Sequence, residues 1–283
     1  MVDLKGAVVI CLFALLPLSA SAIEQKSSTG FELPHTHKLV MESSSGTPYE
    51  LVISLPASYK NSPNKRYPIL YYTDAQWDAP LLSSIYQDLE FDKAVPELVM
   101  VGITYSGVNP NYTALRTKDL TPTKDESFVP DSGGGEVFLK FIKETVIPKI
   151  EGEYRIDKDQ RAIAGWSFGG LFALYAMYNE PQLFKRCIAV SPAVPWDSEY
   201  ISQVDDKFFK SNSKFNARLF ISYGQNESPS FVASVSEFQN KLKNRKAPNL
   251  QLMTYSSENM AHAGTKASAY AQGLVWVWKD ITP

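Results

Sequence analysis

The chain has 283 residues, with 28 lysines and arginines against 30 aspartates and glutamates, so its formal net charge is -2. Hydrophobic residues make up 44% and charged residues 20%, which is ordinary for a globular protein and excludes disordered, collagen-like and heptad-repeat chains. The balanced charge gives no support to nucleic-acid binding, and two cysteines cannot staple a disulfide-rich scaffold.

The first 22 residues have the pattern of a secretory signal peptide. Lys5 precedes an apolar run from Ala7 to Leu18, and Ala20-Ser21-Ala22 is a small-residue site of the kind that signal peptidase accepts. The run is shorter than the about 20 residues that a membrane-spanning helix needs, so an uncleaved anchor is the weaker alternative. We therefore predict cleavage before Ile23 and export to the periplasm or the medium, with no stable membrane anchor.

Residues 23–283 are expected to form a single α/β domain. Short, nearly all-apolar runs predict strands that are covered on both faces, after a first pair joined by a Ser/Gly turn. The predicted strands are His35–Ser43, Tyr49–Leu55, Pro68–Thr73, Leu98–Thr104, Arg161–Gly165, Arg186–Val190, Arg218–Tyr223 and Leu250–Tyr255. Helical spacing of apolar residues predicts helices at Gly135–Glu151, Phe168–Tyr178, Ser230–Lys243 and Thr265–Lys279. This alternation predicts a mostly parallel central sheet with helices on both faces.

Two long segments interrupt that alternation, and we expect both to be loops. Tyr105–Gly134 is rich in proline, glycine and threonine, and Ser191–Phe215 carries Trp196 and an acidic pair. Long loops in compact domains are usually functional or disordered. Both follow predicted strand ends, which is the edge where open α/β sheets bind ligands.

The segment Gly165-Trp166-Ser167-Phe168-Gly169 is a G-x-S-x-G motif. It follows a short apolar strand and precedes a helix-forming run, which is the context of a nucleophile elbow. Small residues let the strand and the helix approach closely, and the tight turn pushes the serine out above the sheet. The alternative is a strand-to-helix turn of small residues without chemistry. We predict that Ser167 is a nucleophile.

A serine hydroxyl needs a neighbouring base, and the chain has three histidines. In this fold the partners follow the order serine, acid, histidine, and His262 alone lies after the serine, in a polar turn before the last helix. His262 is therefore the predicted base. His35-Thr36-His37 could offer two metal ligands, but no further ligand-type residues accompany it, so an exposed strand face is the preferred interpretation.

The acid that orients the histidine is less constrained, since eight carboxylates lie between the serine and the histidine. We choose Glu227, because it lies in the loop after the strand Arg218–Tyr223. Asp197 is the reserve candidate, and a dyad without an acid is the third possibility. An acid in this position holds the imidazole tautomer and stabilises its charged form.

An oxyanion hole needs two backbone N–H donors. One is expected from Phe168, directly after the predicted nucleophile. The other is expected from the loop after Pro68–Thr73, and we favour the amide of Gln76. Chemistry of this kind needs no metal and no organic cofactor.

These residues carry a resemblance to the esterase branch of the α/β-hydrolases that includes esterase D-like enzymes, siderophore trilactone esterases, feruloyl esterases and mycolyl transferases. The chain is similar to it in five stretches, namely Tyr67–Asp74, Val101–Ile103, Arg116–Pro122 (R-x-x-D-[YL]-T-P), Gly165–Gly170 and the segment Ser191-Pro192 with Trp196-Asp197. The siderophore-esterase-like group fits best. Two positions depart from the family pattern: Ala75 replaces a usual glycine in the oxyanion loop, and Trp166 replaces a common histidine in the elbow.

The resemblance implies a serine esterase that acts on a small-molecule ester, with a siderophore (catecholate lactone) ester as the leading specific substrate. It also implies substrate contacts for Arg116, Trp166 and Trp196. For Arg116 two roles stay open: pairing with an anionic group of the substrate, or a structural ion pair with Asp119. Three other functions stay open as well: an acyltransferase on the same fold, a non-catalytic exported binding protein and a serine peptidase.

Overall fold

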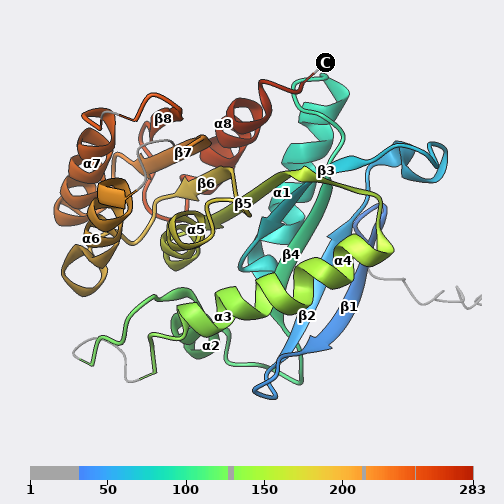
Figure 1. Ribbon diagram of the computed structural model, residues 1–283, viewed down its shortest axis with the longest axis horizontal. Coiled ribbons are helices and arrows are strands. Elements are labelled where there is room, and N and C mark those ends of the chain that lie inside the picture. Colours follow the sequence, from blue (N-terminus) through green and yellow to red (C-terminus); the bar gives the residue numbers. More distant parts are fainter. Residues whose placement is uncertain (1–31, 127–130, 212–214, 246, 283) are drawn as a thin grey trace, which may run out of the picture. The chain divides into compact units, whose positions relative to one another are not determined.

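The computed structural model describes residues 32–126, 131–211, 215–245 and 247–282 (Figure 1). The predicted signal peptide, residues 1–22, lies outside this part of the chain. The elements in chain order are β1 (Thr36–Glu42), β2 (Pro48–Ser54), the 3₁₀ turn η1 (Ala57–Lys60), β3 (Tyr67–Tyr72), α1 (Ala75–Phe91), β4 (Val99–Tyr105), α2 (Tyr112–Leu120), α3 (Gly135–Phe141), the π-helical turn η2 (Ile142–Val146), α4 (Ile147–Glu153), β5 (Ile156–Trp166), α5 (Phe168–Asn179), β6 (Arg186–Val190), α6 (Trp196–Ser211), β7 (Ala217–Gly224), α7 (Pro229–Lys243), β8 (Leu250–Ser257) and α8 (Lys266–Trp278).

One eight-stranded sheet runs through these elements in the order β1-β2-β4-β3-β5-β6-β7-β8. β1 pairs antiparallel with β2, and β2 pairs antiparallel with β4, whereas every later pair is parallel. The tight turn between β1 and β2 contains Gly46 at φ 79°, a left-handed conformation that glycine adopts without steric cost. The predicted mostly parallel sheet with helices on both faces is confirmed.

The two faces of the sheet bury two separate apolar cores. Successive residues of β3 alternate between them, because side chains on a strand point to opposite faces: Ile69 and Tyr71 join one core, and Leu70 and Tyr72 the other. Helices α1 and α8 cover the second face, and α3 to α7 pack over the first, as Figure 1 shows. No helix in the described part of the chain is long and apolar enough to cross a membrane.

Three helices lie where the sequence analysis expects none. Helix α2 lies inside the expected loop Tyr105–Gly134, and α6 lies inside the expected loop Ser191–Phe215. Both expectations of irregular structure are wrong. Helix α2 is short and mostly polar, and it begins at Asn111, whose side chain accepts a hydrogen bond from the Ala114 N–H (3.1 Å).

The other two differences have similar local causes. Helix α1 was not expected, and Pro80 lies within it, which is unfavourable inside a helix. The expected helix Gly135–Glu151 exists, but the π-helical turn η2 divides it, and its second part ends at Glu153. A single wider turn shifts the apolar face without ending the helix.

The chain reverses direction along the sheet between β3 and β5. β4 lies on one side of β3, and β5 to β8 continue on the other side. Such a switch point leaves a crevice at the carboxyl ends of the two strands, which is where open α/β sheets bind ligands. The residues that follow these ends are Asp74 after β3 and Ser167 after β5.

Candidate active site

Ser167 lies at a strained turn between β5 and α5. Its backbone has φ 58° and ψ -119°, a conformation that non-glycine residues avoid and that functional sites tolerate at a cost of about 1–3 kcal/mol. A Cβ on Gly165 would lie 2.3 Å from the backbone carbonyl of Gly169, and a Cβ on Gly169 would lie 2.3 Å from Oγ1 of Thr73. The G-x-S-x-G spacing is therefore required by the close contact between the strand, the helix and the end of β3.

The structure brings Ser167, His262 and Glu227 together in one hydrogen-bonded chain. The Ser167 Oγ lies 2.9 Å from Nε2 of His262, and Nδ1 of His262 lies 2.5 Å from Oε2 of Glu227. The three residues come from the elbow, from the turn before α8 and from the turn after β7. They meet because β5, β6, β7 and β8 are parallel neighbours whose carboxyl ends share one edge of the sheet.

Glu227 is held as a carboxylate. Its side chain is 2% exposed, and this burial alone would raise its pKa, but hydrogen bonds from His262, from the Gly224 N–H (2.6 Å) and from Ser191 Oγ (2.7 Å) outweigh it and lower the pKa. A carboxylate accepts hydrogen bonds only, so Nδ1 of His262 carries the proton and donates it. Nε2 of the neutral ring is then an acceptor and faces the serine hydroxyl, as a general base must.

Ser191 and Gly224 were not predicted to have a role in the site. Ser191 is fully buried, has φ 40° and follows β6, whereas Gly224 ends β7. The available signal was their position at the carboxyl ends of the neighbouring apolar strands β6 and β7.

The predicted second donor of the oxyanion hole, the amide of Gln76, lies in the first turn of α1. This helix begins after Asp74, whose left-handed backbone (φ 59°, ψ 36°) turns the chain out of β3. Among the described residues the Gln76 N–H has no backbone acceptor, as expected of the first turn of a helix. The Gln76 side chain is held at both ends, by Oδ1 of Asp74 (3.3 Å) and by the Thr104 hydroxyl (2.6 Å).

Arg116 pairs with Asp74 and not with Asp119, so the Arg116–Asp119 ion pair, one of the two roles left open for Arg116, does not form. Nε and Nη2 of Arg116 donate to the two carboxylate oxygens of Asp74, both at 2.8 Å. These bonds outweigh the effect of burial and raise the pKa of Arg116. Asp119 instead accepts a hydrogen bond from Tyr49 (2.6 Å), and burial raises its pKa. Residues three positions apart on a helix are neighbours, yet here each of them bonds to a different buried side chain outside the helix.

The two tryptophans predicted to contact substrate lie in different surroundings. Trp166 is half-buried, its indole N–H donates to the His262 carbonyl (2.9 Å), and its ring centroid lies 4.7 Å from that of His262. Trp196 is buried, its N–H donates to Thr123, and its ring packs edge-on against Phe168 at 5.2 Å. Trp166 thus lies beside the serine and contacts His262, whereas Trp196 packs against the ring of Phe168.

The alternatives kept open for the acid and for a metal find no support in the geometry. Asp197 is half-buried in the first turn of α6, and no hydrogen bond joins it to His262 among the described residues. His37 contacts the Tyr154 hydroxyl (2.7 Å). In the described part of the chain, no group of three or more histidine, cysteine or carboxylate side chains could hold a metal ion.

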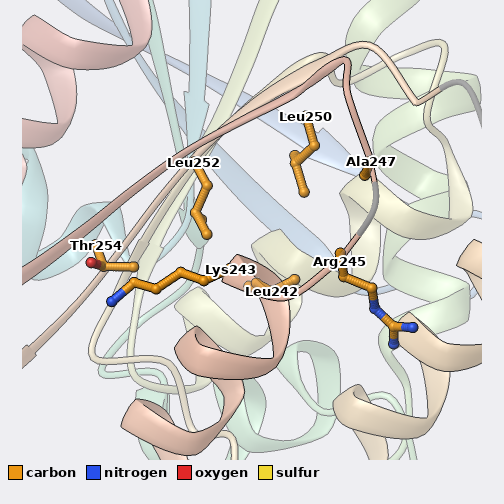
Figure 2. A pocket seen from close by; sticks show the side chains of 7 residues that line it. All are labelled: Leu242, Lys243, Arg245, Ala247, Leu250, Leu252 and Thr254. Carbon is orange, nitrogen blue, oxygen red and sulfur yellow. The ribbon is translucent and has the colours of Figure 1, made fainter.

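A cavity of about 310 Å³ lies at the edge strand β8 and is separate from this site (Figure 2). Leu250 and Leu252 of β8 point toward the end of α7, and the guanidinium of Arg245 bonds to Asp205 and Asp206. The full lining is Leu242, Lys243, Arg245, Ala247, Leu250, Leu252 and Thr254. None of these residues belongs to the hydrogen-bonded chain around Ser167.

Comparison with known proteins agrees with this architecture. Residues 43–272 match the family described as "Putative esterase". The chain is 30% identical to ferri-bacillibactin esterase BesA of Bacillus subtilis (strain 168), over 69% of this chain and 71% of that protein. It is 31% identical to the siderophore triacetylfusarinine C esterase of Aspergillus fumigatus, over 60% of each. The crystal structure of the BES protein from Bacillus cereus superposes with a TM-score of 0.80 at 24% identity, covering 89% of this chain and 98% of that one.

The family match spans most of the chain, and the sheet order, the elbow and the helices on both faces are those of an α/β-hydrolase. The chain therefore belongs to the esterase family of the α/β-hydrolases and is a carboxylic ester hydrolase.

Proposed function

We propose that this protein is a serine esterase in which Ser167, His262 and Glu227 form the catalytic triad. The hydrogen-bonded chain from Ser167 Oγ through the imidazole to the buried Glu227 carboxylate is the observation that carries the proposal. Ser167 Oγ attacks the ester carbonyl carbon while His262 Nε2 takes its proton. Glu227 holds the ring in the tautomer that accepts this proton and stabilises the imidazolium.

The tetrahedral intermediate carries an oxyanion, and we assign the backbone N–H groups of Phe168 and Gln76 to it. When the intermediate collapses, the C–O bond to the alcohol breaks and the imidazolium gives its proton to the leaving oxygen. Water then attacks the acyl-enzyme with the same base, which releases the carboxylic acid and restores Ser167. Each N–H donor of an oxyanion hole typically contributes about 3 kcal/mol to transition-state stabilisation.

The substrate class that we propose is a siderophore ester, such as a catecholate lactone. One relative reported above is named a ferri-bacillibactin esterase and another a siderophore triacetylfusarinine C esterase, which supports this choice. The wall beside Ser167 is aromatic, since Trp166 and Phe231 both pack against His262. We further propose that residues 1–22 direct export and are removed, so that the enzyme meets its substrate outside the cytoplasm.

The test is hydrolysis of short-chain p-nitrophenyl esters and of a tri-catecholate lactone by the wild type and by Ser167→Ala. We expect the wild type to cleave esters, a fluorophosphonate probe to label Ser167, and the variant to lose both. Faster turnover of the lactone than of the simple esters supports the siderophore assignment. A wild type that cleaves nothing and takes no label, or a variant with full activity, contradicts the proposed nucleophile.

A further inference from the structure

Arg116 contacts both segments that carry the proposed oxyanion donors. Through its bidentate ion pair it holds Asp74, the residue that starts the turn leading to Gln76. Its guanidinium carbon also lies 5.3 Å from the ring centroid of Phe168 and 5.7 Å from that of Trp77. The guanidinium is therefore packed between the residue that follows the nucleophile and the residue that follows Gln76.

Both members of the ion pair are removed from solvent. Arg116 is 8% exposed and Asp74 is 2% exposed. If Arg116 turned toward a substrate anion, it would leave the Asp74 carboxylate buried without a counter-ion, which is strongly unfavourable. The pair therefore stays closed while an ester is bound.

Asp74 in turn controls the position of the Gln76 amide. Its carbonyl accepts the N–H groups of Trp77 and Asp78, both at 3.0 Å, and so begins helix α1. Its side chain also accepts the Gln76 side-chain amide (3.3 Å). The left-handed backbone of a non-glycine residue is costly and persists only where surrounding contacts hold it.

We propose that Arg116 is a positioning residue, which holds the amides of Gln76 and Phe168 at the spacing that the oxyanion requires, rather than a ligand for the substrate. This inference rests on the proposed function, because it needs an oxyanion to be stabilised. It assigns the guanidinium a role in turnover that does not depend on the charge of the substrate.

The experiment compares Arg116→Lys, Arg116→Met and Asp74→Asn with the wild type and with Arg186→Met. Arg186 is a matched control, because it too is buried, bonds bidentately to a carboxylate (Asp280, 2.6 and 2.8 Å) and packs on an aromatic ring (Trp278, 4.9 Å). It is the first residue of β6, so it lies at the amino ends of the strands, whereas Ser167 lies at their carboxyl ends. Lysine keeps the charge at position 116 but cannot make the bidentate bond.

Three quantities are measured for each variant: kcat and KM on neutral p-nitrophenyl butyrate, the same constants on anionic p-nitrophenyl hemisuccinate, and Ki of a trifluoromethyl ketone, whose adduct carries an oxyanion. We expect kcat to fall by roughly 10–100-fold for the variants at positions 116 and 74 on both esters, with KM nearly unchanged, since a misplaced donor loses part of what a deleted one does. Ki should weaken by a similar factor. Arg186→Met should lower the unfolding temperature but keep kcat and Ki.

Two results overturn the inference while leaving the esterase intact. One is a rise of KM that is confined to the anionic ester, with kcat unchanged, which makes Arg116 a substrate ligand. The other is a loss of kcat no larger than that of Arg186→Met, which makes the pair merely structural. If Arg116→Met does not fold, Arg116→Lys and Asp74→Asn decide the question. A wild type without esterase activity is a different failure, because it removes the proposed function and the inference together.

Discussion

At the scale of single residues, the site depends on one buried carboxylate that stays ionised. Glu227 is nearly inaccessible, yet three hydrogen bonds hold its pKa below the ordinary value for glutamate. Its Oε1 is used by Ser191 and Gly224, which leaves Oε2 for His262. Two donors at the ends of β6 and β7 thus fix Oε1 of Glu227, and this orients Oε2 toward the imidazole.

Glu227→Gln should reverse the imidazole tautomer. The amide oxygen of the new side chain can still accept from Ser191 and Gly224, so its NH₂ group faces Nδ1 of His262 as a donor. Nε2 then carries the proton and cannot accept the one from Ser167. We expect kcat to fall by about 10²–10⁴-fold with KM little changed, since an equivalent acid-to-amide change in a serine protease costs about 10⁴.

Two control variants accompany Glu227→Gln. Asp197→Asn tests the reserve acid and should keep kcat within about twofold, because Nδ1 of His262 bonds to Glu227 and no hydrogen bond joins His262 to Asp197 among the described residues. Glu151→Gln removes another buried carboxylate, which bonds to Arg161 at 2.5 Å, and should cost stability without loss of kcat. A large loss from Asp197→Asn, with Glu227→Gln active, would show that the acid was assigned wrongly.

The residues of the candidate site differ in how far the sequence alone could predict them. Ser167 and His262 could be predicted because a short motif marks one and elimination among three histidines marks the other. Glu227 needed the strand assignment of β7 as well. The pairing of Arg116 with Asp74 could not be predicted, because 42 residues separate the two and the helix that directs Arg116 inward was not foreseen.

At the scale of elements, the elbow joins β5 and α5 so closely that two of its positions admit only a hydrogen atom as side chain. The sequence showed this elbow plainly, since an apolar strand, a small-residue turn and an apolar helix follow one another. It did not show α1, because burial of this segment against α8 and the sheet overrides the unfavourable proline at position 80. Tertiary packing also explains why polar α2 is helical.

Gly165→Ala adds only one methyl group, but it should distort the elbow and lower both kcat and stability. The new Cβ would lie 2.3 Å from backbone atoms of Gly169, so the strand and the helix must separate. A displacement of the nucleophile by about 1 Å can cost 10²-fold in rate, and we expect a loss of kcat of at least that order, together with a lower unfolding temperature. Esterase assays and thermal unfolding measure the two effects.

Gly152→Ala is the matched control for that substitution. Gly152 lies near the end of α4, and an added Cβ would meet no atom within 4 Å. Alanine in a helix is more stable than glycine by about 0.5–1 kcal/mol, so this variant should be fully active and at least as stable as the wild type. Equal behaviour of the two alanine variants would contradict the steric account of the elbow.

At the scale of the whole molecule, an ion pair between a buried carboxylate and a half-buried lysine connects helices α1 and α8 beside the site. Asp78 of α1, in the helix that begins with the proposed oxyanion donor, accepts from Lys266 of α8 (2.6 Å) and from Tyr270 (2.8 Å). The residues of the ion pair are 188 positions apart. Lys266 also lies over the ring of Trp166, at 4.9 Å, and Trp166 contacts His262. Stability and alignment of the site are therefore linked through this network.

Lys266→Met should make the stability of the protein depend on pH in a defined direction. Burial raises the pKa of Asp78 even with Lys266 and Tyr270 beside it, so in the folded protein the charged carboxylate is unfavourable above that pKa. Without Lys266 the carboxylate has no counter-ion, and we expect a loss of about 3 kcal/mol in the free energy of unfolding at pH 8. As the pH falls through the raised pKa, Asp78 binds a proton and the cost is relieved, so the deficit relative to wild type should shrink by pH 5.

Urea unfolding at pH 8 and pH 5 measures this deficit, with two companion variants. Asp78→Asn/Lys266→Met removes both charges, so it should recover most of the lost stability and show no added pH dependence. Lys143→Met breaks the surface ion pair with Glu180 and should leave the stability nearly unchanged at either pH, because surface pairs contribute little. A deficit of Lys266→Met that stays constant or grows toward pH 5 would mean that Asp78 does not take up the proton, and that Lys266 stabilises the molecule by packing on Trp166 instead.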